Sequence, residues 1–135
     1  MFYEYDLTIP ANTPATALSE LEAVLDVGRI VGVEVQFPRG CVGLVHVAVR
    51  RELHQLWPTN PDGFIAGENA NIKWSEDLDL LEAPYTLTLV GYNEDDSFPH
   101  TVTFRFNLLP VAAPAAPAAP PLAAPAIVEE FALEL

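Results

Sequence analysis

The chain has 135 residues, with six Lys plus Arg against nineteen Asp plus Glu, which gives a formal net charge of −13. Such an acidic surface repels phosphate backbones and anionic lipid headgroups, so we expect neither nucleic acid nor a membrane as a partner. A single cysteine, Cys41, excludes a disulfide framework or a cysteine-based zinc site within one chain.

The N-terminal part of the chain predicts β-structure. Apolar residues of "YEYDLTI" alternate with polar ones from Tyr3 to Ile9, which is the period of a half-buried strand. Residues 19–27, "SELEAVLDV", fit either a helical face or an alternating strand, and we favour the strand because Gly28 follows closely and the neighbouring segments are β. Residues 29–37 alternate again, and "PRG" at 38–40 predicts a tight turn.

The rest of the first 109 residues follows the same pattern. The run "CVGLVHVAVRR" begins with Cys41 and is rich in β-branched residues. The stretch "SEDLDLLEAP", residues 75–84, is expected to be an acidic connection, and "NEDDSFPH", residues 93–100, a polar loop. Strands are expected at residues 3–9, 19–27, 29–37, 41–51, 53–57, 71–74, 85–92 and 101–109. About eight short strands predict an all-β fold, an antiparallel β-sandwich or jelly roll.

The C-terminal part is compositionally separate, so we expect a body of residues 1–109 and an extended arm of residues 110–135. Prolines and alanines dominate the arm and favour polyproline II, in which residues 110–126 would reach roughly 50 Å at about 3.1 Å per residue. The prolines expected to keep the arm extended, and so to contribute to partner binding, are Pro114, Pro117, Pro120, Pro121 and Pro125.

The arm ends in the apolar segment "IVEEFALEL", residues 127–135. Read as a strand, it places Phe131, Leu133 and Leu135 on one face and suits addition to an exposed sheet edge. Read as a helix, it places Ile127, Phe131 and Leu135 on one face. In both readings the segment is an apolar anchor for a partner, formed by Ile127, Val128, Phe131, Leu133 and Leu135.

Candidate catalytic residues are few. The serines lie outside any nucleophile-elbow sequence such as G-x-S-x-G, and His46, His54 and His100 have no metal-binding spacing. We interpret Cys41 as a small buried apolar residue and His46 as a core or interface histidine. The sequence therefore predicts no enzymatic activity and no cofactor.

Two kinds of ligand site have candidate residues in this sequence. Asp95 and Asp96, in the loop "NEDDS", are weak candidates for a structural calcium site, which the acidic residues 76–79 could approach. A carbohydrate site would use exposed aromatic rings, for which the candidates are Trp57, Trp74, Tyr85 and Tyr92. Solvated acidic loops and buried aromatic rings are the simpler explanations of both patterns.

The arm is the most informative feature of the sequence. Ordering a chain costs roughly 1–2 kcal/mol per residue in backbone entropy, reduced for proline. Contacts among Ala and Pro return little of this cost, so an ordered arm needs a partner along which to lie. This predicts an assembly in which the arm of each subunit binds a neighbouring subunit. Once the arm is bound, further contacts between the two subunits form as if within one molecule, which strengthens the assembly.

The body segments "VEVQFPRGCVGLVHVAV", "HQLWPTNPDG" and "PYTLTLVGYNEDDSFPHTVTFRF" resemble the decoration, or cement, proteins on the heads of tailed bacteriophages. The resemblance lies in the general character of residues 1–109, a small acidic β-sandwich, and not in a specific sequence motif. It implies a virion protein on the capsid surface that bridges capsid subunits, often as a trimer. It implies the major capsid protein and other copies of this chain as partners. The N-terminus "MFYEYDLTIP" has acidic residues where a signal peptide needs basic ones, so we expect synthesis in the host cytoplasm.

A structural capsid subunit is therefore the expected function. The alternatives are a carbohydrate- or calcium-binding sandwich of a virion or cell surface, and a single jelly-roll capsid protein. The sequence leaves open whether the arm is exchanged between identical chains or binds a different protein.

Overall fold

The computed structural model describes residues 1–110, which form nine β-strands. These are β1 (Phe2–Ile9), β2 (Ser19–Val24), β3 (Gly28–Phe37), β4 (Val45–Arg51), β5 (His54–Trp57), β6 (Ile65–Ala66), β7 (Ala70–Leu80), β8 (Thr86–Asn93) and β9 (His100–Pro110). The five C-terminal anchor residues and the arm prolines from Pro114 to Pro125 lie outside the described residues. No helix of the described part is long and apolar enough to cross a membrane.

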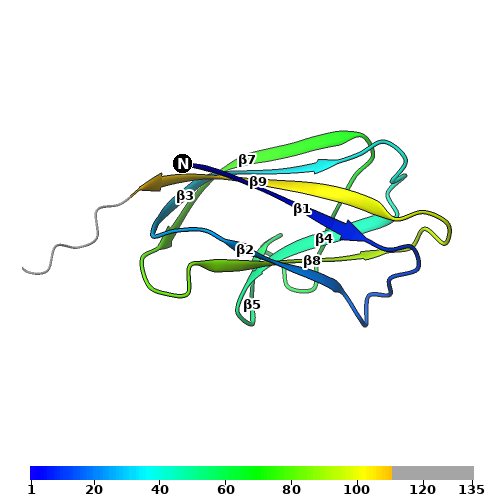
Figure 1. The fold of residues 1–135 in the computed structure, drawn as a ribbon, viewed down its shortest axis with the longest axis horizontal. Coiled ribbons are helices and arrows are strands. Elements are labelled where there is room, and N and C mark those ends of the chain that lie inside the picture. Colours follow the sequence, from blue (N-terminus) through cyan, green and yellow to red (C-terminus); the bar gives the residue numbers. More distant parts are fainter. Residues whose placement is uncertain (111–135) are drawn as a thin grey trace, which may run out of the picture.

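The strands form two antiparallel sheets that pack face to face as a β-sandwich, which confirms the predicted fold class (Figure 1). One sheet has the strand order β1-β9-β3-β7, and we call it sheet A. The other, sheet B, has the order β2-β8-β4-β5, with the short strand β6 also paired to β4.

Alternating residues of the two sheets fill the core. In β9, Val102, Phe104, Phe106 and Leu108 are fully buried between the sheets. The residues between them, from Thr101 to Asn107, face solvent or are only partly buried. The alternation of apolar and polar residues therefore predicted the buried face of β9 correctly. It also predicted correctly that residues 19–27 contain a strand rather than a helix, because they contain β2, in which Ala23 is buried.

Strand β7 corrects the prediction of a short strand followed by an acidic connection. Residues 70–80 form one 11-residue strand that pairs with β3 along its length, from Phe37 opposite Ala70 to Gly28 opposite Leu80. The acidic residues Asp77 and Asp79 do not break it because they lie on the outer face. There they form ion pairs with Arg29, at 3.4 and 3.8 Å.

The start of β4 is a second correction. The expected strand began at Cys41, but residues 41–44 form a turn in which Val42 and Gly43 have positive φ values of 49° and 72°. The Leu44 amide donates to the Cys41 carbonyl across this turn at 2.8 Å. Left-handed backbone cannot join a β ladder, so the strand begins only at Val45.

Two smaller differences concern strand number and the end of the body. Strand β6 has only two residues, too few for an alternating pattern to reveal. Strand β9 includes Pro110, which is paired with Gly28, so the last strand ends one residue later than the expected boundary.

Candidate functional site at the open edge of the sandwich

The two long sides of the sandwich differ. On one side, β1 of sheet A packs against β2 and β8 of sheet B, and the Tyr5 hydroxyl donates to the Val24 carbonyl between the sheets. The opposite side lies between β7 and the strands β5 and β6, where Trp57 of β5 meets Trp74 of β7. This side is the more open one, because a groove runs into it.

A groove of about 350 Å³ lies along this open side. Its lining comes from the end of β5 and the following loop, from β6 and from β7, namely Trp57, Pro58, Thr59, Ile65, Ile72, Trp74 and Glu76. Apolar side chains dominate this lining. The groove therefore suits an apolar surface better than a charged ligand.

The two tryptophans define the groove. Their rings meet edge to face, with centroids 6.0 Å apart and planes 69° apart. Trp57 is only 6% exposed and also packs on Phe106, with ring centroids 6.4 Å apart. Trp74 is partly buried, so it is the indole that the groove presents to solvent.

Glu76 is the one carboxylate of the groove. It shares the inward face of β7 with Trp74 and Leu78 and accepts a hydrogen bond from Trp74 Nε1 at 2.9 Å. A carboxylate turned inward on an edge strand opposes pairing with a further strand. Among the described residues that line the groove, Glu76 has no second titratable side chain beside it, so these residues do not supply an acid–base pair.

One side chain holds the loop that forms the wall of the groove. Gln55 Nε2 lies 2.9 Å from the Pro58 carbonyl oxygen and 3.1 Å from those of Asn60 and Gly63. The "PTNPDG" loop predicted at residues 58–63 is thus tied to β5. Sequence reasoning did not identify Gln55, because its role depends on carbonyl groups that only the folded loop brings together.

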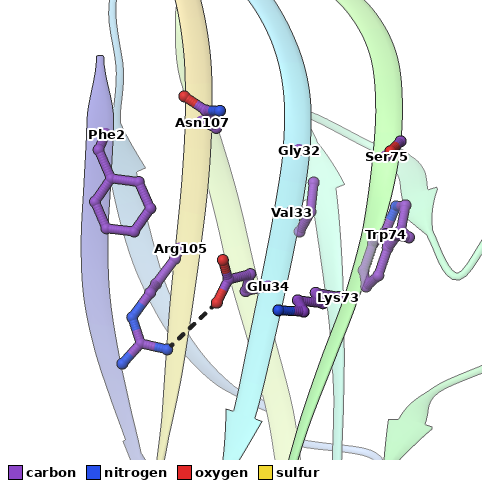
Figure 2. Close-up of a pocket in the computed structure, with 9 residues that line it drawn as sticks. All are labelled: Phe2, Gly32, Val33, Glu34, Lys73, Trp74, Ser75, Arg105 and Asn107. Carbon is purple, nitrogen blue, oxygen red and sulfur yellow. Dashed lines mark ion pairs between the residues drawn. The ribbon is translucent and has the colours of Figure 1, made fainter.

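A second hollow, of about 340 Å³, lies on the outer face of sheet A (Figure 2). It opens where Gly32 has no side chain to fill the row between Asn107 and Ser75. Arg105, which lines the hollow together with Glu34, reaches Glu34 at 3.7 Å and Glu4 at 3.0 Å. Carboxylates on both sides thus hold the Arg105 guanidinium.

The loop after β8 places the two candidate calcium ligands differently from expectation. The Asp95 carboxylate accepts hydrogen bonds from the Ser97 amide at 2.9 Å and pairs with His100 Nε2 at 2.8 Å. The hydrogen bond from His100, followed by that from Ser97, lowers the pKa of Asp95. The Asp96 carboxylate accepts from the Ser97 hydroxyl.

The acidic residues 76–79 do not approach this loop. Leu78 and Asp79 pair with Ile30 and Arg29 at one end of β3, whereas β9 starts beside the other end. In the described part of the chain, no group of three or more His, Cys, Asp or Glu residues could hold a metal ion.

The remaining candidate residues are scattered. Cys41 is completely buried, and burial raises the pKa of its thiol, with further contributions from the Glu68 and Asp95 charges. A buried thiol with a raised pKa is a poor nucleophile. His46 stacks on Tyr92 on the outer face of sheet B, at 4.5 Å between ring centroids, and His54 is exposed on β5.

The four aromatic residues considered for carbohydrate binding do not form one platform. Only Trp57 and Trp74 meet, and Trp57 belongs to the core. Tyr92 packs edge to face with Phe64, and Tyr85 is partly buried against the core beside Leu25.

No protein-family model and no curated protein matches this chain. Among solved structures, the chain is similar to one described as "Crystal structure of PirA", with 16% sequence identity and a TM-score of 0.37. The alignment covers 78% of this chain and 94% of that one. A similarity of this size supplies no functional information about the protein.

Proposed function

We propose that this protein is a structural subunit of a protein shell, a decoration protein that stabilises a phage head by bridging neighbouring capsid subunits. It binds the major capsid protein and other copies of itself as a trimer on the capsid surface. The C-terminal arm fastens each copy to a neighbour. The proposal rests on an apolar end of the sandwich and on the composition of the arm that continues from it.

That apolar end is where β1 begins and β9 ends, and we call it the arm end (Figure 1). Phe2 pairs with Asn107 and is 60% exposed, and Leu109 two residues further along β9 is 49% exposed. Phe2 and Leu109 lie on the outer face of sheet A, and Met1, Val24 and Leu81 are further large exposed apolar residues at this end. Exposed apolar residues at one end of a strongly acidic protein suit contacts with another protein.

The acidic charge fits the same role. A net charge of −13 keeps free subunits apart in solution until a partner surface of matching shape is present. The arm then adds a tether, so that several weak contacts act together.

Sedimentation velocity of the full-length chain tests this function. We expect self-association that is weakened by Phe2→Ser with Leu109→Ser at the arm end, and by Phe131→Asp with Leu133→Asp in the anchor. Val42 and Phe98 lie in loops at the other end and are 69% and 66% exposed, so Val42→Ser with Phe98→Ser is the matched control. Monomers at all concentrations, or equal effects of test and control variants, would contradict the assembly role.

The capsid assignment needs its own experiment. An antibody against the body should label the outer surface of phage heads released by the cells that make the protein. Labelling of tails alone, or of no particle, would exclude the decoration role while leaving self-association intact.

A further inference from the structure

We propose that the groove beside β7 receives residues 127–135 of a neighbouring copy of this chain, as a strand added next to residues 70–75. This inference rests on the proposed function and deepens it, because it names the docking site of the arm. Three observations carry it: the unequal protection of the β7 edge, the apolar lining of the groove, and the point at which the described chain ends.

Strand β7 is an edge strand of sheet A, so one row of its backbone N–H and C=O groups has no partner within the sheet. Its two halves differ. The second half carries the inward-facing Glu76, and its register with β3 is irregular between Ile30 and Gly32. Inward charges and bulges are devices that prevent edge-to-edge pairing.

The first half of β7 lacks these devices. From Ala70 to Ser75 it pairs with β3 in regular register, and its inward residues Ile72 and Trp74 line the groove. Its one charged residue, Lys73, is exposed and faces outward. A lysine on an edge strand also discourages pairing, but Lys73 lies outside the groove and leaves the inward side of this half apolar. This half of the edge is therefore the less protected one.

The terminal segment has the pattern that this site requires. In a strand, Ile127, Phe131, Leu133 and Leu135 share a face, with Glu129 as the exception. That face would lie over Ile72 and Trp74 and close the sandwich toward Ile65, while main-chain hydrogen bonds join the segment to β7.

The length of the arm and its direction favour a neighbouring copy. Pro110 pairs with Gly28, which pairs with Leu80, so Pro110 is two strands away from the end of β7. At about 4.8 Å between strands and 3.3 Å per residue, Trp74 lies roughly 20–25 Å back along the sheet from Pro110. Strand β9 points away from this groove, and five prolines between residues 111 and 126 oppose a reversal of the chain. An extended arm of roughly 50 Å instead carries the segment to another molecule.

The terminal segment and the groove both carry acidic residues. The segment contains Glu129, Glu130 and Glu134, and the groove contains Glu76. Salt screens such repulsion between exposed charges. Docking should therefore become stronger as the salt concentration rises, which is opposite to the behaviour of an interface held by ion pairs.

Tryptophan fluorescence of the full-length protein tests the site directly, because the chain contains two tryptophans and both line the groove. Trp74 is the more accessible of the two. As the protein concentration rises, acrylamide should quench its fluorescence less and its emission maximum should shift to the blue. Leu133→Asp should abolish this change. Ala132→Asp adds the same charge on the opposite face of the strand and should preserve it.

The outcomes separate this inference from the proposed function. If the chain associates in sedimentation but Trp74 stays equally accessible in the wild type and Leu133→Asp, the assembly role stands and the groove assignment is wrong. If Trp74 is protected to the same extent at every concentration in a monomer, the segment docks in its own molecule. That result would overturn both the neighbouring copy as occupant and the support that the arm gives to assembly.

Discussion

Asp95 holds the loop between β8 and β9 in place through several hydrogen bonds. Its carboxylate accepts hydrogen bonds from the Ser97 amide at 2.9 Å and the Phe98 amide at 3.3 Å, and it pairs with His100. The Asn93 side-chain amide donates to the Phe98 carbonyl at 3.0 Å from within the same loop. An acidic sequence that suggests a calcium loop is thus explained by hydrogen bonds that hold the turn between β8 and β9.

The lowered pKa of Asp95 makes part of the stability depend on pH. The stabilisation is complete above the unfolded-state value of about 3.9 and is lost as the pH falls through the lower folded-state value. Asp95→Asn should therefore lower Tm near neutral pH, and its difference from the wild type should shrink between about pH 5 and pH 2. Thermal unfolding followed by circular dichroism checks this, with Asp96→Asn as the control. A difference that stays constant with pH would refute the proposed role of the Asp95 charge.

Glycine packing gives a second prediction at the residue scale. A Cβ atom at Gly91 would lie 2.5 Å from Ile9 Cδ1 and 3.0 Å from the His46 carbonyl oxygen, because Ile9 of sheet A fills the space above this glycine. Gly91→Ala should cost about 1–3 kcal/mol through overpacking. At Gly32 the nearest atom would be Asn107 Cβ at 3.6 Å, an ordinary contact.

Gly32→Ala is therefore the matched control, and its free energy of unfolding should stay within about 0.5 kcal/mol of the wild type. Urea unfolding of the two variants makes the comparison. Equal losses at both positions would show that strand glycines matter here for a reason other than the space above them.

At the scale of elements, β7 was the least predictable strand. Its second half reads as an acidic linker, yet it pairs with β3 because Asp77 and Asp79 face solvent and Leu78 and Leu80 face inward. An alternation of acidic and apolar residues is compatible with an edge strand, whose outer face needs no apolar cover. Sequence alone did not show that this segment had a pairing partner.

Glu76 should protect the edge that β7 exposes. Glu76→Val removes the inward charge and the acceptor of the Trp74 indole N–H, and should increase aggregation through edge pairing. Ser75→Val adds the same apolar side chain on the outward face and keeps the charge. Light scattering at a temperature below unfolding compares the two, and greater aggregation of Ser75→Val would argue that general surface hydrophobicity is responsible.

At the scale of the whole molecule, every core residue of the described structure lies between Leu7 and Leu108. A chain truncated after Pro110 should therefore fold alone. Its Tm, measured at low protein concentration, should differ from that of the full-length chain by less than the roughly 4–8 °C that 1 kcal/mol represents in a small domain. A large loss of cooperativity on truncation would mean that the arm completes the core of its own molecule.

The sequence by itself determined the all-β class, most strand positions and the face that each strand buries, because a period of two is a local property of the chain. It also marked Cys41 as buried. Only the tertiary structure decided that β7 is one long edge strand, that Trp57 and Trp74 meet in a groove, and that Asp95 pairs with His100. The first two features join residues that are distant in sequence, and the Asp95–His100 pair depends on how the loop between β8 and β9 folds, which an alternation of residue types does not record. Which edge of a sandwich stays open likewise depends on long-range packing that no local pattern records.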